Sequence, residues 1–306
     1  MVAWGWGVRK PPALRPGDLI GVVAPGAAVE EAAVRAGARV LEGAGYRVRV
    51  GASVLKQAGY LAGSDAERLA DLIAMFTDPD VRAIVAARGG YGSGRLLPLF
   101  DPVIARRHPK IFVGYSDLTF LLTQLVQRAG LVAFHGPMVA GLDKNLDGAA
   151  ALIGLLTGDR ADWNMAAATI LQPGTAEGVL VGGCLSILVA SLGTPYALET
   201  TGRLLFIEDV NEKPYRIDRM LTQLRQAGKL DDVAGVIFGE MAGCASAPNE
   251  AVTALDVIRA AFSAARYPVV FGLSTGHGRG ATTLPLGIRA RLAGERLTLL
   301  ESPVAE

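Results

Sequence analysis

The sequence has few of the residues that mark disulfide-rich or metal-binding proteins. Among its 306 residues are two cysteines, Cys184 and Cys244, and three histidines. No Cys-x-x-Cys occurs, so we expect free thiols in a reducing compartment rather than a disulfide framework or a thiolate zinc site. The histidines form no H-x-x-x-H or H-E-x-x-H pattern, which argues against a catalytic zinc ion. No metal site is therefore predicted.

Long charge runs and uninterrupted hydrophobic runs are also missing. The 30 basic and 29 acidic residues give a formal net charge of +1, without a basic tail, so no nucleic-acid partner is expected. Residues 178–198 carry no charge, but Gly182-Gly183, Gly193 and Pro195 interrupt them, which favours a buried strand and helix over a membrane span. The N-terminus lacks a charged region ahead of an apolar stretch, so no secretory signal is predicted. We expect a cytoplasmic protein with no membrane partner.

What the sequence has in abundance is apolar residues, 51% of the chain, in segments that alternate between strand and helix patterns. The short apolar runs 18–26 and 110–115 are each followed by a helical pattern, and the run 81–87 leads into a glycine-rich loop. Such alternation with short connections predicts an α/β protein with a mainly parallel sheet covered on both faces. In such sheets ligands bind at the carboxyl ends of the strands.

The length of the chain indicates two domains. We expect an α/β domain over residues 1–150, a linker over 151–174, and a C-terminal domain over 175–306 that ends in a hairpin turning at Ala293-Gly294. Ser64 and Glu67 have the spacing of a capping box and predict the start of a helix, with a cap as the preferred role of Ser64.

The three histidines are the first candidates for acid–base chemistry. His108 lies in a charged loop, where a solvated role is favoured. His135 follows a predicted strand and could line a cleft or be a hydrogen-bonded structural residue. His277 lies in a loop of Gly, Ser and Thr after another strand, which leaves room for a substrate. His277 ranks first and His135 second, and a structural role remains open for both.

A glycine-rich loop, "RGGYGSG" at residues 88–94, follows the strand at 81–87. It lacks the Lys-Ser/Thr ending of a P-loop and the G-x-G-x-x-G spacing of dinucleotide folds, so no nucleotide cofactor is predicted. The loop could be a simple flexible turn. Alternatively, its backbone could approach a ligand and donate N–H groups to an oxyanion.

Two adjacent acids, Glu208 and Asp209, end the predicted strand "RLLFIEDV". Neighbouring strand residues point to opposite faces, so only one of the two can easily face a cleft. An acid in that place could orient a histidine, as the third member of a catalytic triad does. The residues alone favour a surface acid paired with one of the nearby bases.

Ser116 follows the strand at 110–115 and directly precedes a helical pattern. The nucleophile elbow of many hydrolases reads Gly-x-Ser-x-Gly, whereas here Leu118 replaces the second glycine. At a helix N-terminus the N–H of Asp117 could point toward a developing negative charge. Judged on the elbow alone, an N-cap serine is the favoured interpretation.

Six segments in order resemble the LD-carboxypeptidases, the serine peptidases that trim murein tetrapeptides, whose superfamily includes the microcin-C immunity peptidases. The resemblance runs from about residue 18 to about 299. The segments are "RGGYGSGRLL", "FVGYSDLTFLL", "HGPM", "GGCLSIL", "LLFIEDVNEKPYRIDRML" and "STGHG". The resemblance implies a flavodoxin-like N-terminal domain, a smaller C-terminal domain with a β-barrel-like sheet, a homodimer, and no cofactor.

The resemblance also implies the roles of individual residues. It gives a Ser–Glu–His triad of Ser116, Glu208 and His277, and leaves His135 a wall or structural residue. The oxyanion hole would use the N–H groups of Asp117 and of Gly90, with Gly89 as the alternative to Gly90. We further expect Arg88 to bind the terminal carboxylate of a murein peptide and Tyr91 to contact the substrate.

Two other functions stay open on the sequence. One is hydrolysis of peptidyl- or aminoacyl-nucleotides of the microcin-C type, which needs an aromatic platform for the base, for which Trp163 is the candidate. The other is non-catalytic ligand binding on a flavodoxin-like scaffold, because a fold does not fix a function.

Overall fold

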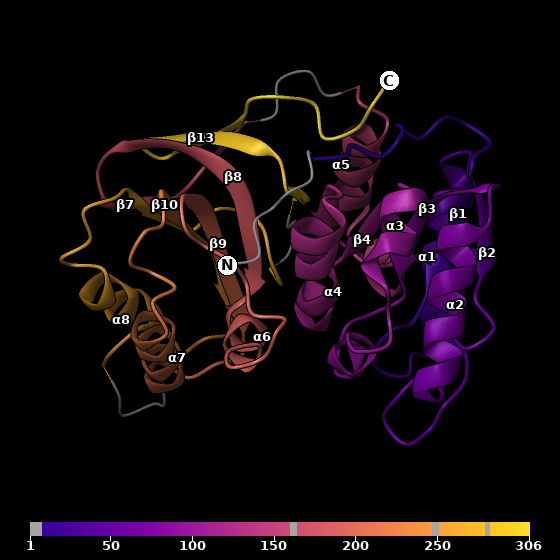
Figure 1. Cartoon of the computed structure of the whole chain (residues 1–306), viewed down its shortest axis with the longest axis horizontal. Coiled ribbons are helices and arrows are strands. Elements are labelled where there is room, and N and C mark those ends of the chain that lie inside the picture. Colours follow the sequence, from indigo (N-terminus) through magenta and orange to yellow (C-terminus); the bar gives the residue numbers. More distant parts are fainter. Residues whose placement is uncertain (1–7, 160–163, 247–250, 279–281) are drawn as a thin grey trace. The chain divides into compact units, whose positions relative to one another are not determined.

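The chain forms two compact units (Figure 1), each described separately below. Unit 1 comprises Met1–Ala161, Thr282–Gly287 and Ser302–Glu306, and unit 2 comprises Asp162–Ala281 and Ile288–Glu301. The chain therefore returns to unit 1 twice near its C-terminus. The computed structural model describes residues 8–159, 164–246, 251–278 and 282–306.

Unit 1 is built on a six-stranded sheet in the order β12-β5-β4-β3-β1-β2. Its strands are β1 (Leu19–Val23), β2 (Arg47–Val50), β3 (Val81–Ala86), β4 (Ile111–Gly114), β5 (Ala133–His135) and β12 (Leu284–Leu286). All neighbouring strands are parallel except β12, which pairs antiparallel with β5. The order 2-1-3-4-5 is that of flavodoxin-like folds, and it confirms the predicted mainly parallel, flavodoxin-like unit.

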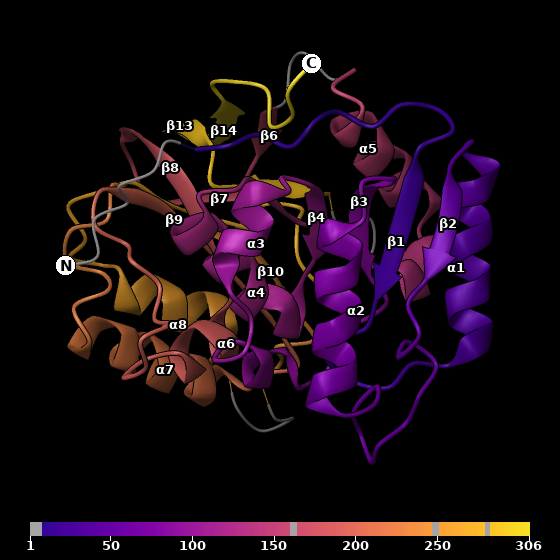
Figure 2. The same cartoon turned by 45° about the vertical axis from the view of Figure 1, so that its right-hand side comes forward.

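Helices cover this sheet, and its central strands β1, β3 and β4 are buried along nearly their whole length, whereas the edge strand β2 is largely exposed. The α-helices of unit 1 are α1 (Glu31–Gly43), α2 (Asp65–Thr77), α3 (Pro102–Arg107), α4 (Thr119–Gln124) and α5 (Leu146–Leu156). Single turns and short helical segments are η1 (Ser93–Leu96), η2 (Ser116–Leu118), η3 (Leu125–Ala129) and η4 (Val139–Lys144). Figure 2 shows α2, α3 and α4 on the viewer's side of the sheet.

Helix α2 confirms the predicted capping box. The Ser64 hydroxyl accepts the N–H of Glu67, and the Glu67 carboxylate accepts the N–H of Ser64, so two backbone donors at the start of the helix are satisfied. The helix then buries Leu72, Met75 and Phe76 against the sheet. The sequence thus determines both where α2 begins and which of its faces is buried.

Unit 2 is built on an eight-stranded sheet in the order β6-β14-β13-β8-β9-β10-β11-β7. Its strands are β6 (Asn164–Ala166), β7 (Thr169–Gln172), β8 (Thr175–Cys184), β9 (Arg203–Val210), β10 (Gly235–Ala242), β11 (Val269–Phe271), β13 (Arg289–Ala293) and β14 (Arg296–Leu299). Strands β6 and β7 lie at opposite ends of this order, yet only two residues separate them in the chain. The sheet therefore curls back on itself, in agreement with the expected barrel-like sheet.

The described residues of unit 2 form the helices α6 (Leu185–Ala190), α7 (Pro214–Gln226) and α8 (Ala254–Ala261). Strands β13 and β14 form the predicted hairpin, in which Ala293 pairs with Arg296. Residues 151–174, which the sequence predicts as a linker, hold the second half of α5 and the strands β6 and β7. Cys184 and Cys244 are both buried free thiols, as predicted.

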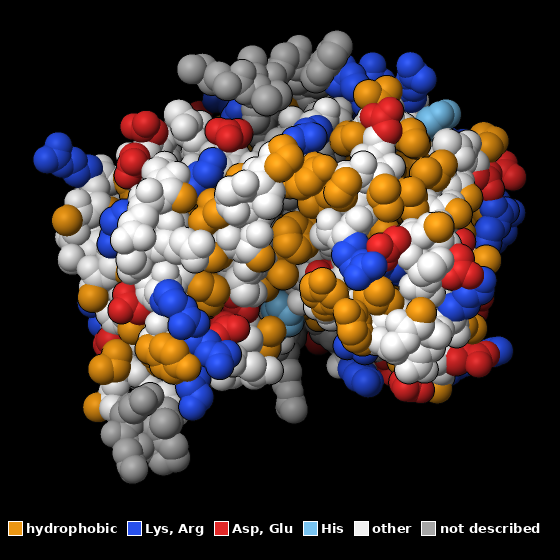
Figure 3. Space-filling model, turned by 60° about the horizontal axis from the view of Figure 1, so that its bottom comes forward, with side chains coloured by type: hydrophobic (Ala, Val, Ile, Leu, Met, Phe, Trp, Pro, Cys, Tyr) orange, Lys and Arg blue, Asp and Glu red, His pale blue; other side chains and the backbone are white. Residues whose placement is uncertain are grey.

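The surface carries mixed charge, in keeping with the near-neutral composition. On the face drawn in Figure 3, Lys and Arg side chains are interspersed with Asp and Glu side chains. Within the described ranges, no helix is both long enough and apolar enough to cross a membrane.

Candidate active site

Three loops of unit 1 leave the carboxyl ends of neighbouring parallel strands. Strand β1 leads into Pro25 and Gly26, β3 leads into the glycine-rich loop 88–94, and β4 leads into Ser116. Parallel strands place these loops along one edge of the sheet, where α/β proteins bind ligands. The fold thus brings Ser116 and the glycine-rich loop together within one unit.

Ser116 occupies a strained turn between β4 and the following helix. Its φ angle is +62°, in the left-handed region that serine rarely adopts, and this costs about 1–2 kcal/mol. The residues that precede η2 and α4 are Tyr115 and Leu118, and neither position carries a side-chain cap. Ser116 is therefore not the N-cap of either helix, in contrast to the interpretation that the elbow alone favours. A strained strand-to-helix serine is the geometry of a nucleophile elbow.

Glycine is required at both positions of the Gly89-Gly90 pair, for different reasons. A Cβ atom on Gly89 would lie 3.0 Å from the Cβ and 3.3 Å from the Oγ of Ser116, so the bare backbone of Gly89 packs against the serine. Gly90 has a φ angle of +93°, and a Cβ there would lie 2.5 Å from that of Ala27. The backbone of Gly89 is therefore in close contact with Ser116, and the backbone of Gly90 is in close contact with Ala27.

The Asp117 side chain holds the glycine-rich loop in place. Its carboxylate accepts the N–H of Gly92 at 3.3 Å and of Ser93 at 2.8 Å, and the Ser93 hydroxyl donates to its backbone oxygen at 2.6 Å. The side chain is buried, and burial raises the pKa of Asp117 while these hydrogen bonds oppose the rise. The residue after the candidate nucleophile thus ties two turns together.

The remaining candidates of unit 1 differ in exposure. Arg88 is exposed and donates to the backbone oxygen of Ala28 at 3.2 Å. Tyr91 is 55% exposed and its ring meets Tyr60 edge-on, with 5.6 Å between centroids. His135 is buried at the end of β5, where its ring meets that of Tyr115. Both Arg88 and Tyr91 are therefore open to a ligand, whereas His135 belongs to the interior.

In unit 2 the structure brings Glu208 and His277 together, as the resemblance implies. The His277 Nδ1 atom lies 2.6 Å from Glu208 Oε2, and the carboxyl is fully buried at the end of β9. Nδ1 is therefore the ring nitrogen that faces the carboxylate. A Cβ on Gly276 would lie 2.8 Å from Glu208 Oε2, so glycine lets the His277 loop approach the carboxyl.

The two adjacent acids have separate tasks. Asp209 points away from this pair, and its carboxylate accepts the N–H of Ser186 at 2.8 Å in the first turn of α6. The alternation along β9 therefore gives Glu208 to the histidine and Asp209 to a helix start.

A third carboxylate, Glu240 near the end of β10, binds backbone atoms of the loop that contains His277. It accepts the N–H of Gly278 at 2.8 Å, and its own N–H donates to the Thr275 oxygen at 3.0 Å. Burial raises the pKa of Glu208, a rise that His277 opposes, and burial also raises the pKa of Glu240. Three carboxylates therefore surround the loop of His277: Glu208 contacts the ring, Glu240 binds the backbone, and Asp209 adjoins Glu208 in the chain.

Sequence reasoning did not single out Glu240 or Arg68, whose side chain is fully buried beside the glycine-rich loop. A weak signal existed for Glu240, because it ends a predicted strand as Glu208 does. Arg68 directly follows the capping box, and nothing in the pattern shows that it turns inward. His108 is exposed at the end of α3, as predicted, and Trp163 lies outside the described residues.

The fold defines the class of protein: it is a two-unit α/β protein, and the sheet of unit 1 has the strand order of flavodoxin-like folds. Residues 20–136 match the LD-carboxypeptidase N-terminal domain, and residues 177–292 match the LD-carboxypeptidase C-terminal domain. The chain belongs to the LD-carboxypeptidase family.

Individual relatives agree with this assignment. The chain is 42% identical to a probable murein peptide carboxypeptidase of Bacillus subtilis, over 97% of this chain and 96% of the relative. The muramoyltetrapeptide carboxypeptidase of Oxalobacter formigenes superposes with a TM-score of 0.85 at 30% identity, covering 94% of this chain and 100% of the other. The microcin C7 self-immunity protein MccF shares the fold, with a TM-score of 0.88 at 23% identity over 97% of this chain and 99% of the other.

Proposed function

We propose that this protein is a serine LD-carboxypeptidase that cleaves the terminal L,D-peptide bond of murein tetrapeptides and releases D-alanine. The observation that carries the proposal is the pair of the partly exposed His277 with the fully buried Glu208, with 2.6 Å between Nδ1 and Oε2. The strained Ser116 of unit 1 supplies the matching nucleophile. The names of its relatives support murein peptides as the substrate class.

In the proposed reaction His277 removes the hydroxyl proton of Ser116 as the Ser116 Oγ attacks the carbonyl carbon. Glu208 holds the imidazole in the tautomer with a proton on Nδ1 and stabilises the imidazolium that forms. The peptide C–N bond then breaks, and the imidazolium gives its proton to the departing amine of D-alanine. Water attacks the acyl-enzyme, again with His277 as the base, and frees the tripeptide and Ser116.

The N–H groups of Gly90 and Asp117 are the proposed donors to the tetrahedral oxyanion, with Gly89 as the alternative to Gly90. Losing one such donor typically lowers the rate by ~10²–10³-fold. Arg88, exposed beside this loop, is the proposed partner of the terminal carboxylate, with Tyr91 as a further contact. An unchanged KM in Arg88→Ala would remove that assignment.

The test is mass spectrometry of tetrapeptide incubated with wild type, Ser116→Ala and a matched surface variant, Ser263→Ala. We expect loss of the terminal D-alanine with wild type and Ser263→Ala, and a rate at least ~10³-fold lower with Ser116→Ala. A tetrapeptide ending in L-alanine and an aminoacyl-nucleotide conjugate of the microcin-C type are run in parallel. Full activity of Ser116→Ala, or preference for the conjugate, would overturn the proposal.

Three further expectations remain part of this proposal: a homodimer, a cytoplasmic location and a role in recycling of peptidoglycan peptides. Light scattering of the purified protein tests the first, and a monomer at micromolar concentration would contradict it. Labelling of Ser116 by a serine-reactive phosphonate separates the enzyme from a non-catalytic binding protein. Absence of labelling would favour binding alone.

A further inference from the structure

A fully buried arginine lies beside the glycine-rich loop of unit 1. The Arg68 side chain has an exposed fraction of 0%, although it carries a permanent charge. Burying such a charge is costly unless hydrogen bonds and an opposite charge compensate it. An apolar residue would fill the same space at lower cost, so the contacts of Arg68 indicate what the residue does.

Those contacts join two loops and one helix. Arg68 Nη1 donates to the backbone oxygen of Pro25 in the loop after β1, and to that of Gly92 at 3.0 Å. Arg68 Nη2 pairs with Asp65 in the first turn of α2. The planar guanidinium can bind these acceptors at fixed angles, which the point charge of a lysine cannot.

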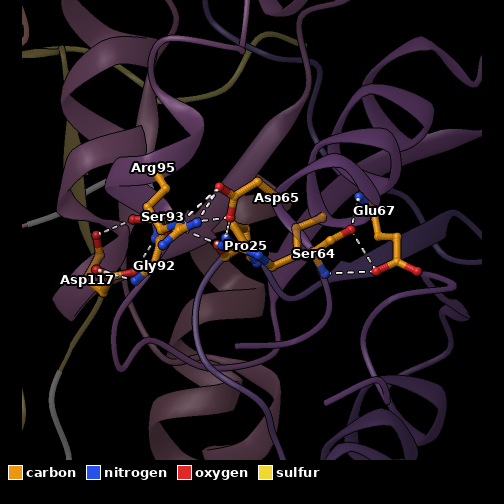
Figure 4. A network of polar contacts seen from close by, with 9 residues as sticks. Pro25, Ser64, Asp65, Glu67, Gly92, Ser93, Arg95 and Asp117 are labelled. Carbon is orange, nitrogen blue, oxygen red and sulfur yellow. Dashed lines mark hydrogen bonds and ion pairs between the residues drawn. The ribbon is translucent and has the colours of Figure 1, made fainter. Parts of the chain in front are cut away.

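The network continues to the surface and to the residue after the nucleophile (Figure 4). Arg95 binds both oxygens of Asp65, at 2.8 to 3.0 Å, and holds the pKa of that carboxyl below its usual value. On the other side of Gly92, its N–H and that of Ser93 bind the Asp117 carboxylate. Gly92 is thus held through both its oxygen and its N–H.

The loop after β1, which Arg68 contacts at Pro25, also binds the other end of the glycine-rich loop. The N–H of Ala27 donates to the oxygen of Gly89 at 3.2 Å. Fixing Pro25 and Gly92 together therefore fixes the segment between Gly89 and Gly92, which contains the proposed oxyanion donor. Positioned donors stabilise a transition state more than mobile ones do.

We infer that Arg68 is a positioning residue, which holds the N–H groups of the glycine-rich loop toward the charge that develops at Ser116. The inference rests on the proposed function and adds a residue that touches no reacting atom. Its effect should fall on kcat rather than KM, because the oxyanion exists only in the transition state.

The test uses Arg68→Lys in the full chain, with Arg35→Lys as the matched control. Arg35 is a surface arginine that pairs with Glu31 on α1. We expect kcat on the tetrapeptide to fall ~10–100-fold in Arg68→Lys with KM within about twofold of wild type. The second-order rate of Ser116 phosphonylation by a peptidyl phosphonate ester should fall in parallel. Arg35→Lys should match wild type in both measurements.

A second variant keeps the inference testable if Arg68→Lys does not fold. Arg95→Gln changes an exposed side chain that contacts the network through Asp65, and we expect a ~3–10-fold lower kcat at unchanged KM. Wild-type kcat and phosphonylation rates in the folded variants would overturn the inference, as would a rise in KM alone. These outcomes leave the proposed function intact, because the wild type and Ser116→Ala decide that separately. A wild type whose Ser116 does not react with the phosphonate overturns both.

Discussion

The surroundings of Ser116 in unit 1 and those of His277 in unit 2 are held in place by different means. In unit 1 the Asp117 carboxylate binds backbone N–H groups and the Arg68 guanidinium binds backbone oxygens, so both signs of charge position the loops. In unit 2 the His277 loop is positioned by Glu208 and Glu240. The first arrangement combines cations with anions, and the second places several acids near one imidazole.

The acidities of the carboxyls follow their immediate surroundings in both units. Asp65, paired with Arg95, has a pKa below its usual value. Burial raises the pKa of Asp117 in unit 1 and those of Glu208 and Glu240 in unit 2, because it disfavours their charged forms, and in Glu208 the neighbouring acids add to the rise. Sensitivity to side-chain shape should be greatest in unit 1, where the glycine-rich loop packs against Ser116.

The largest effect within this comparison is expected from the acid that orients the histidine. Glu208→Gln should lower kcat ~10³–10⁴-fold, because an amide cannot stabilise the imidazolium and can favour the wrong tautomer. The neighbouring Asp209→Asn is the matched control. It should change kcat less than ~10-fold, because Asp209 binds the start of α6 instead. Steady-state kinetics on the tetrapeptide measure both variants. A larger loss of kcat in Asp209→Asn than in Glu208→Gln would mean that Asp209, and not Glu208, orients the histidine.

An intermediate effect is expected from shape alone in unit 1. In Gly89→Ala the added Cβ would lie 3.0 Å from that of Ser116, so either the serine or the loop must shift, and kcat should fall ~10²-fold. Gly154→Ala, in the interior of α5 where a Cβ meets nothing within 4 Å, should keep full activity and gain ~0.5–1 kcal/mol in stability. Steady-state kinetics measure the activity of the two variants and thermal unfolding measures their stability. Full activity of Gly89→Ala would show that the packing of Gly89 against Ser116 does not matter for catalysis.

The sequence predicts those features around Ser116 and around His277 that depend on local pattern. The run at 110–115 places Ser116 at a strand end, and strand alternation predicts that Glu208 and Asp209 diverge. Which of the two acids faces the histidine follows from the family resemblance rather than from the pattern. The left-handed backbone of Ser116 has no sequence signal, because Leu118 stands where the elbow motif has a glycine.

What the sequence does not predict are contacts made across the fold. In the sequence Arg68 cannot be told from a surface arginine of an amphipathic helix. The arrangement of β1, β3 and α2 shows that its side chain turns inward. Strand β12 contains Pro285, which reads as a break, yet an edge strand tolerates proline because one side of it needs no donor. A domain boundary predicted from composition therefore misses the return of this segment to unit 1.

The smallest effect is expected from Glu240, and it concerns pH rather than rate. Glu240→Gln keeps an oxygen that can accept the Gly278 N–H, so kcat on the tetrapeptide should stay within about twofold of wild type. The substitution removes a carboxyl whose pKa burial raises, so its effect should appear in the pH dependence of stability.

Stability should respond to the same substitution with a defined sign. Because burial raises the pKa of Glu240, its contribution to folding is present below its ordinary pKa of 4.5 and is lost as pH rises through the folded-state value. The unfolding free energy of Glu240→Gln relative to wild type should therefore increase from pH 4.5 upward. Urea unfolding across this range measures it, with the exposed Glu199→Gln as control. An unfolding free-energy difference that stays constant from pH 4.5 upward would show that folding does not perturb the Glu240 carboxyl.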